Sequence, residues 1–302
     1  MKSSSAMATK KNMFLSLLLV VAVSAIVLFH FSGRQQQHRQ LYSNLDPKTV
    51  HLKHNSWLLF ITFSYDALKG NEQNDKKRDK YQPFILNNCL LVKEAGHIMH
   101  IYTDDMDQEY CRYCDCIQYE AYNCECPGYN CTERRNICEK NYLYADLLAK
   151  EDEFVFLDFD LAIVKPEKFF PELYARSRVA DFLATRAHGV YKSPTSMKYK
   201  EDFNSGLVFI RALTGVDPYK LREILYEGKG NVYDQHVLSQ FVHQYYDDAR
   251  WDELSIKWHC RLIGEIFKDM PLEDCYTIHS PGLLRELNYT LVKPKVEVLV
   301  PS

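Results

Sequence analysis

The sequence predicts an α/β domain with a sheet of parallel strands, preceded by a membrane anchor. Three observations lead to this prediction. The composition is globular, with 302 residues of which 46% are hydrophobic. An uncharged apolar segment lies near the N-terminus, and from about residue 57 onward short apolar runs alternate with segments of helical periodicity. In such a sheet, ligands bind beyond the carboxyl ends of the strands.

The first segment, Met13 to Phe31, contains nineteen residues without a charge. At about 1.5 Å per residue it covers roughly 28 Å, the thickness of a bilayer's hydrocarbon core. We expect an uncleaved signal anchor; the alternative is a cleaved signal peptide, whose apolar region usually has about 7–15 residues. Residues 1–12 then form a cytosolic tail, and the remaining chain lies in the lumen of the Golgi or endoplasmic reticulum as a single-pass type II membrane protein.

The charges are distributed unevenly along the chain. Residues 1–41 hold five of the 37 basic side chains and no acidic one, which leaves 32 bases against 40 acids and a formal charge near −8 for the rest. Because nucleic acid binding requires a basic face, this distribution argues against a nucleic acid partner.

The lumenal part divides into a stem and one domain. Residues 32–55 show no apolar periodicity and read as a short stem, and 56–302 form the domain. Its expected strands are 57–63, 97–103, 154–164, 181–187 and 203–210. Its expected helices are 81–95, 136–149, 217–226 and 234–246.

A cysteine-rich insertion interrupts this alternation at 111–138. Seven of the ten cysteines lie in it: Cys111, Cys114, Cys116, Cys124, Cys126, Cys131 and Cys138. We expect disulfides, since lumenal thiols oxidise; the alternative is a zinc knuckle, because Cys111-x-x-Cys114 has ligand spacing. Seven is an odd number, so Cys89, Cys260 or Cys275 is expected to complete the pairing. The glycosylation sequons at Asn130 and Asn288 fit the same compartment.

Two acids follow the most apolar run. Asp158 and Asp160 come directly after Phe154-Val155-Phe156-Leu157 and are one residue apart, so both carboxylates lie on one side of an extended chain. Paired carboxylates repel each other unless a divalent cation lies between them and a phosphate-bearing ligand. The pattern therefore predicts a cation site; alone, it is also compatible with an acidic turn.

Four motifs in order resemble one enzyme group. They are FVFLDFDLAIVKP, DFNSGLVFIR (202–211), YDQHVL (233–238) and IHSPGLLR (278–285). Their order and spacing are similar to those of retaining nucleotide-sugar glycosyltransferases of the GT-A fold, in family 8 and its neighbours. The resemblance spans residues 57–285.

The resemblance implies a metal site made of Asp158, Asp160 and His279, with Mn²⁺ or Mg²⁺ as the cofactor. The mixture of nitrogen and oxygen donors favours Mn²⁺ over Ca²⁺. Arg285 stands where the group has a lysine and would hold the diphosphate, bidentately if required. Glu286-Leu287 replaces the Pro-Trp that often follows in the group.

The same resemblance assigns the reacting sugar to three residues. Asn204 would hydrogen-bond the donor sugar, Asp234 would orient its hydroxyls, and Gln235 would face the side from which the new bond forms. Without the resemblance, Asp234 also reads as a helix N-cap and Asn204 as part of a strand-initiating turn.

The nucleotide is expected at the ends of the first strands. There Thr62, Tyr65 and Asp104 would contact the base and ribose, and Lys140 a phosphate. Asp104-Asp105 is more plausibly a loop cap than a second metal site. Asp146 stands where relatives often carry an arginine.

The implied function is metal-dependent transfer of a sugar from a nucleotide-diphosphate donor, expected to be a UDP-sugar, to a hydroxyl of a glycan, glycoprotein or glycolipid. A carboxamide at Gln235 disfavours a covalent sugar adduct, so retention by same-face attack is expected. Two alternatives stay open: an inactive membrane-tethered carbohydrate-binding protein, or an interaction protein that uses 111–138. Trp251 and Trp258 are expected in the core or, less readily, at an acceptor pocket.

Overall fold

The computed structural model describes residues 56–65, 72–122, 131–187, 203–227, 234–246, 250–261 and 271–279. The fold described here belongs to the compact unit Asn55–Ser302. The predicted anchor at 13–31, the stem at 32–55 and Arg285 lie outside the described residues. Within the described ranges, no helix combines the length and the apolar character needed to cross a bilayer.

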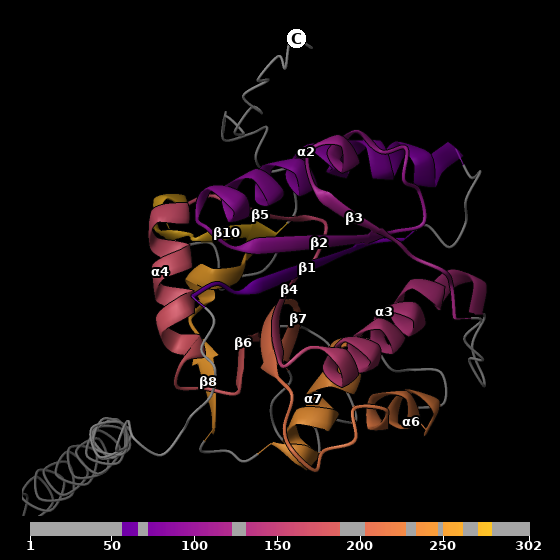
Figure 1. Ribbon diagram of the computed structural model, residues 1–302, viewed down its shortest axis with the longest axis vertical. Coiled ribbons are helices and arrows are strands. Elements are labelled where there is room, and N and C mark those ends of the chain that lie inside the picture. The colour runs from indigo at the N-terminus through magenta and orange to yellow at the C-terminus, as the bar shows by residue number, and fades with distance from the viewer. Residues whose placement is uncertain are drawn as a thin grey trace, which may run out of the picture. The chain divides into compact units, whose positions relative to one another are not determined.

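Ten strands form two sheets in the described residues (Figure 1). The main sheet has seven strands in the order β3-β2-β1-β4-β7-β6-β8. Their bounds are β1 Leu59–Ser64, β2 Ile98–Thr103, β3 Asp115–Gln118, β4 Glu153–Leu157, β6 Phe182–Arg186, β7 Phe203–Arg211 and β8 Trp251–Leu254. The small sheet has the order β5-β10-β9, with β5 Leu161–Ile163, β9 Cys260–Arg261 and β10 Thr277–His279.

Within the described ranges, five α-helices and three short 3₁₀ helices accompany the sheets. The α-helices are α2 Glu72–Glu94, α3 Cys131–Lys150, α4 Pro166–Ser177, α6 Lys220–Glu227 and α7 Asp234–Tyr245. The 3₁₀ helices are η1 Glu109–Arg112, η3 Ile256–His259 and η5 Leu272–Asp274.

Two apolar layers enclose the main sheet (Figure 1). Helices α3, α6 and α7 pack on one face, where Phe154, Phe156 and Val208 point. Helices α2 and α4 cover the other face, toward which Val155 and Leu157 point. The alternation of successive β4 residues between the two layers follows from the two-residue period of a strand.

The sheet is mixed, so the expectation of parallel strands is wrong for β7. This strand runs antiparallel to both β4 and β6, while β1 is parallel to β2 and β4. All nine residues of β7 are buried. A central strand that is buried on both faces has the same apolar pattern in either direction, so the sequence pattern could not reveal its orientation.

Two further expectations need correction. The run 154–164 is not one strand, because Asp158–Asp160 divides it into β4 and β5, which belong to different sheets. Helix α4 is absent from the expected helices. Pro166 occupies the first turn, where a missing N–H is tolerated, and Pro171 lies inside the helix.

The predicted disulfides are confirmed for part of the cysteines. Cys89 pairs with Cys114, so a cysteine outside the insertion does complete the pairing, and Cys111 pairs with Cys116. The zinc-knuckle alternative for Cys111 and Cys114 is therefore wrong. Part of the insertion joins the main sheet, since Asp115–Gln118 adds to the edge of β2 as a parallel strand.

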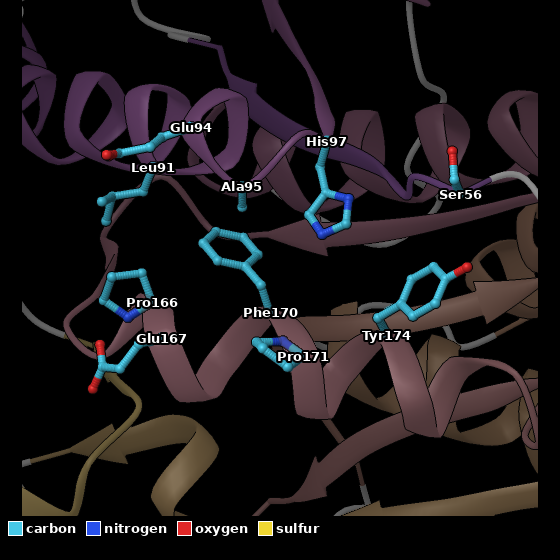
Figure 2. Close-up of a pocket in the computed structure, with 10 residues that line it drawn as sticks. All are labelled: Ser56, Leu91, Glu94, Ala95, His97, Pro166, Glu167, Phe170, Pro171 and Tyr174. Atoms are coloured by element: carbon cyan, nitrogen blue, oxygen red, sulfur yellow. The ribbon is translucent and has the colours of Figure 1, made fainter.

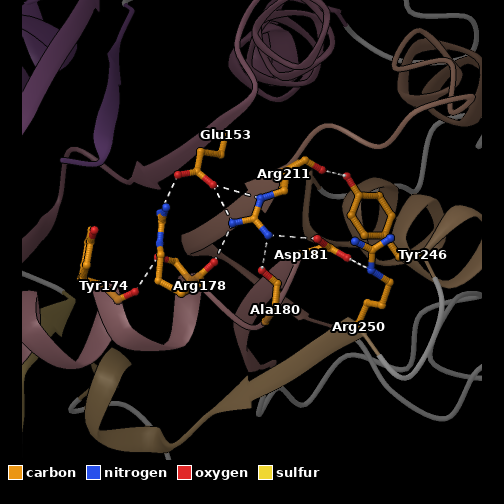
Figure 3. Close-up of polar contacts among 9 residues, drawn as sticks. Glu153, Tyr174, Arg178, Ala180, Asp181, Arg211, Tyr246 and Arg250 are labelled. Carbon is orange, nitrogen blue, oxygen red and sulfur yellow. Dashed lines mark hydrogen bonds and ion pairs between the residues drawn. The ribbon is translucent and has the colours of Figure 1, made fainter. Parts of the chain in front are cut away.

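A buried ionic network fastens the end of the sheet away from the acids (Figure 3). Arg211 binds Glu153 at 2.7 Å and Asp181 at 3.1 Å, and donates to the backbone carbonyls of Ser177 and Ala180. Arg178 binds the second oxygen of Glu153. The network joins the start of β4 to the end of β7, which fixes the relative position of the strands whose other ends carry the site.

Candidate functional site

Asp158 and Asp160 lie immediately beyond the carboxyl end of β4. The backbone N–H of Asp158 donates to the carbonyl of Gly206 in β7, and the N–H of Leu161 donates to the carbonyl of Asp158. This turn takes the chain out of the main sheet into β5. Asn88 of α2 holds β5 in place by bonding the backbone of Leu161 and Ile163.

His279 reaches these acids from the C-terminal part of the chain. Strand β10 pairs antiparallel with β5, with His279 opposite Leu161. Nε2 of His279 lies 2.8 Å from Oδ1 of Asp160. One ligand atom from each of Asp158, Asp160 and His279 lies within 4.8 Å of the others. Pairing of the two short strands thus brings together the three residues that the motifs indicated.

The donor set of this triad fits a divalent cation. Two carboxylates and one imidazole provide mixed oxygen and nitrogen ligands, a set that suits Mn²⁺. Burial raises the pKa of Asp158, and the neighbouring Asp160 raises it further against the opposing effect of Lys140. Burial also acts to raise the pKa of Asp160, but the hydrogen bond and charge of His279 outweigh it, so this pKa is lowered. A bound cation would relieve the mutual repulsion of the two acids.

Lys140 of α3 lies buried beneath the acids. Its Nζ is 2.7 Å from Oδ1 of Asp158 and 2.8 Å from Oδ2 of Asp234, and it lies 4.7 Å from the ring centroid of Phe156. Burial lowers the pKa of Lys140, but the two carboxylates raise it by more, so the amine stays protonated. Lys140 therefore links the acid pair to α7 through two ion pairs within the protein. Its expected phosphate contact stays a prediction.

Asp234 begins α7 and is fixed from two sides. Its Oδ2 accepts from Lys140 and from Oγ of Ser205, the latter at 2.6 Å. Burial raises the pKa of Asp234, but Lys140 and Ser205 overcome this effect and lower the pKa to about 2. Gln235 follows in the first turn of α7 and is half-buried.

Gly206 makes room for three polar groups. A Cβ atom on this residue would lie 2.7 Å from Nε2 of His259, 2.9 Å from Oδ2 of Asp158 and 3.0 Å from Oδ1 of Asn204. Asn204 also accepts a hydrogen bond from the N–H of Gly206 at 2.8 Å. Glycine is thus required because functional side chains approach the backbone closely at this point.

His259 is a site residue that sequence reasoning missed. It ends η3, is 4% exposed, and its ring centroid lies 4.5 Å from that of His279. No motif in the sequence marks it; the structure places it directly before β9, whose Cys260 pairs with Ile278 of β10.

The three residues expected to contact the base and ribose lie at the ends of β1 and β2 but have different partners and burial. Thr62 is buried and its hydroxyl donates to the carbonyl of Leu157, so it joins β1 to β4. Tyr65 lies just beyond β1, stacked on Phe63 and edge-on to Tyr119. Asp104 directly follows β2 and is half-buried.

Other residues singled out from the sequence have structural partners. Asp105 accepts hydrogen bonds from the N–H of Asp107 and from Gln108, which agrees with loop capping. Asp146 binds Arg222 at 2.5 Å. Trp258 is 1% exposed in the apolar layer under α4, as expected of a core residue, and Trp251 is half-buried.

A separate cavity of about 510 Å³ lies between α2 and α4 (Figure 2). His97, immediately before β2, faces Phe170 and Tyr174, and the carboxylates of Glu94 and Glu167 lie toward one end of the cavity. The cavity lies by the amino ends of β1 and β2, whereas Asp158 follows the carboxyl end of β4. It is thus at the opposite edge of the sheet from the acids.

Comparison with known proteins identifies the fold. No family model and no curated protein matches the sequence. Among solved structures, the galactosyltransferase LgtC in complex with donor and acceptor sugar analogues has a TM-score of 0.50 at 12% identity, covering 79% of this chain and 98% of that one. Mouse xyloside xylosyltransferase 1, apo form, has a TM-score of 0.48 at 16% identity, covering 79% and 99%. The likeness to LgtC confirms the predicted GT-A fold.

Proposed function

We propose that this chain is a metal-dependent glycosyltransferase that moves a sugar from a nucleoside diphosphate donor to a hydroxyl group of a glycan or glycoconjugate. One observation carries the proposal: Asp158, Asp160 and His279 converge beyond the carboxyl end of β4, where ligands bind in sheets of this kind. The shared fold and the similarity of the four motifs to family 8 support the same reading.

The cation would be held by Asp158, Asp160 and His279, with Mn²⁺ preferred over Mg²⁺ because of the imidazole. When bound, such a cation supplies positive charge that stabilises the negative charge developing on a departing diphosphate. We propose that Arg285 adds a guanidinium to the same end of the donor, as its place in the motif implies.

The protein's own contribution is to orient the sugar. Lys140 and Ser205 hold one oxygen of Asp234, which keeps this carboxylate charged and fixed. We assign Asp234 to the sugar hydroxyls, Asn204 to a second contact with the sugar, and Gln235 to the reacting face. The acceptor oxygen bonds to the anomeric carbon while the bond from that carbon to the diphosphate breaks, and the acceptor proton passes to the diphosphate. Attack from the leaving-group side retains the anomeric configuration.

For the nucleotide, we propose a uridine diphosphate bound at the ends of β1 and β2. Tyr65 offers an aromatic ring for the base, and Asp104 a carboxylate for the ribose. Thr62 is left out of this assignment because its hydroxyl already bonds Leu157.

We also propose that the enzyme acts in the lumen of the Golgi or endoplasmic reticulum, anchored by residues 13–31. Disulfides in the described part of the chain, among them Cys89–Cys114, Cys111–Cys116 and Cys260–Cys275, are consistent with an oxidising compartment. Microscopy of the tagged full chain in cells tests this location; a cytosolic signal would contradict it.

A donor panel tests the proposed reaction. The full chain is incubated with UDP- and GDP-sugars, an acceptor glycan mixture and either Mn²⁺ or a chelator, and release of nucleoside diphosphate is measured. We expect turnover with at least one donor, loss of turnover with the chelator, and loss in Asp160→Asn. Binding of a nucleoside diphosphate without any turnover across the panel would contradict the enzymatic proposal, and an inverted product anomer would contradict retention.

A further inference from the structure

The cavity between α2 and α4 is a space that the proposed transfer reaction does not use. Its volume of about 510 Å³ lies within the range of about 300–1,000 Å³ that small-molecule sites have. Phe170 and Leu91 line it and are each 5% exposed. Behind them, Phe60 of β1 contacts both His97 and Phe170, with ring centroids 5.7 Å apart in each pair. The core therefore fixes these rings before any ligand binds, which lowers the entropic cost of binding.

His97 contributes a polar group to the wall of the cavity without adding a positive charge. Its Nδ1 accepts a hydrogen bond from the backbone N–H of Leu58 at 3.2 Å, so the proton of the neutral ring is on Nε2. Burial lowers the pKa of His97, which keeps the ring neutral near pH 7. Arg178 lies over the ring of Tyr174, 4.8 Å from its centroid, but its guanidinium is paired with Glu153. Among the described residues that line the cavity, none therefore carries a positive charge.

Two carboxylates lie at one end of the cavity (Figure 2). Glu94 ends α2, Glu167 lies in the first turn of α4, and both are exposed. Neither forms an ion pair with another residue in the described part of the chain. The dipole of α4 favours an acid at the position of Glu167, whereas the C-terminal end of α2 carries partial negative charge and disfavours Glu94. A positive charge at this end of the cavity would relieve the unfavourable position of Glu94.

We propose that the cavity binds a small organic amine, with its apolar body against Phe170 and Leu91 and its ammonium group at Glu94 and Glu167. The body would remove apolar surface from water, and the two carboxylates would attract an ammonium group and repel an anion. A cavity of this volume with aromatic walls favours a body broader than the methylene chain of a lysine side chain, because unfilled space forfeits packing contacts. The cavity lies at the opposite edge of the sheet from Asp158, so this inference does not rest on the proposed function.

A matched set of indoles tests the preference for positive charge. Tryptamine, tryptophol and indole-3-propionate share one aromatic body and end in an ammonium, a hydroxyl and a carboxylate, respectively. Each is titrated into the full chain near pH 7, and its affinity is measured by ligand-observed NMR. We expect tryptamine to bind most tightly and indole-3-propionate most weakly. Equal affinity for tryptamine and tryptophol would overturn the inference. Binding of a capped lysine-containing tripeptide by a chain that does not bind tryptamine would also overturn it, since the occupant would then be a peptide.

Substitutions in the cavity test where the amine binds. Glu94→Gln and Glu167→Gln should each weaken tryptamine binding about two- to fivefold and leave tryptophol binding unchanged, because an exposed ion pair contributes modestly. Ala95→Trp should abolish binding of both ligands, since Ala95 lines the cavity and is exposed, so that a large ring there fills the space without entering the core.

Glu227→Gln is the matched control, because Glu227 is an exposed acid at the end of α6 and does not line the cavity. It should leave the affinity for all three indoles unchanged. Unchanged tryptamine affinity in both Glu94→Gln and Glu167→Gln, or an equal loss in Glu227→Gln, would overturn the inference. None of these titrations includes a metal or a nucleotide, so their failure would leave the proposed transferase function untouched.

Discussion

Nε2 of His279 lies 2.8 Å from Oδ1 of Asp160, although 119 residues separate them in the chain. The contact exists because β5 leads directly out of the acid pair and β10 leads directly into the histidine, and these strands pair with each other. A three-residue strand pairing thus closes the site. Substitutions that disturb this pairing or the groups beneath it should therefore affect cation binding.

Replacement of Lys140 by Met should destabilise the fold. Lys140 is buried between Asp158 and Asp234, and its removal leaves two carboxylates without their counter-ion. Breaking such a pair costs about 3 kcal/mol or more. The measurement is urea denaturation followed by tryptophan fluorescence. Lys93→Met is the control, because the exposed Lys93–Asp115 pair should contribute less than about 1 kcal/mol. Equal losses in the two variants would contradict the role given to Lys140.

Gly206→Ala should weaken cation binding strongly while destabilising the fold only modestly. The new methyl group would approach the ends of three side chains, which can shift, so we expect a stability loss of about 1–2 kcal/mol. The displaced Asp158 should weaken Mn²⁺ binding at least tenfold. Gly96→Ala is the control, because a methyl group there meets no neighbouring atom but the residue has φ +78°, which strains any residue other than glycine. It should cost about 1 kcal/mol through backbone strain and leave Mn²⁺ binding unchanged, as calorimetric titration would show.

The pH dependence of the free energy of unfolding should reveal the lowered pKa of Asp234. Its pKa is about 2 in the folded protein, below the ordinary value of 3.8, so its contribution is fully present above pH 4 and is lost as the pH falls toward 2. The shift corresponds to about 2 kcal/mol. Unfolding free energies of the wild type and Asp234→Asn, measured from pH 6 to pH 2, should therefore converge at the acidic end. A difference that stays constant over this range would exclude a lowered pKa.

Removal of the Cys260–Cys275 disulfide should affect both stability and the site. The cysteines are 15 residues apart, and a loop of that length implies a loss of about 3 kcal/mol when both become Ser. Because the bridge holds β9 beside β10, which carries His279, Mn²⁺ affinity should fall as well. Cys111→Ser with Cys116→Ser opens a bridge of separation 5 elsewhere and should leave Mn²⁺ affinity unchanged. If removal of either bridge changed Mn²⁺ affinity equally, the Cys260–Cys275 bridge would have no particular role in positioning His279.

The sequence carried enough information to find the triad but not its surroundings. Asp158 and Asp160 follow a buried strand, and His279 is marked by its motif, so local patterns sufficed. The role of Lys140 depends on how α3 is rotated against β4, which helical periodicity does not define. His259 depends on the pairing of two- and three-residue strands, which are too short to leave a pattern.

The fold was predictable to a similar degree. Alternating apolar runs identified most strands, because each must bury its side chains whatever its direction. The reversed orientation of β7 and the division of 154–164 between two sheets depend on long-range pairing, which only the folded chain reveals. The hydroxyl of Thr62 shows the same limit, since its partner Leu157 is 95 residues away.

The most direct test is calorimetric titration of UDP into the full chain with and without Mn²⁺, compared with Asp160→Asn and His279→Asn. We predict UDP binding that requires Mn²⁺ in the wild type and is lost in both variants, because each removes one ligand of the triad. UDP binding that persists in both variants, or that needs no divalent cation, would contradict the assignment of Asp160 and His279 to one metal site.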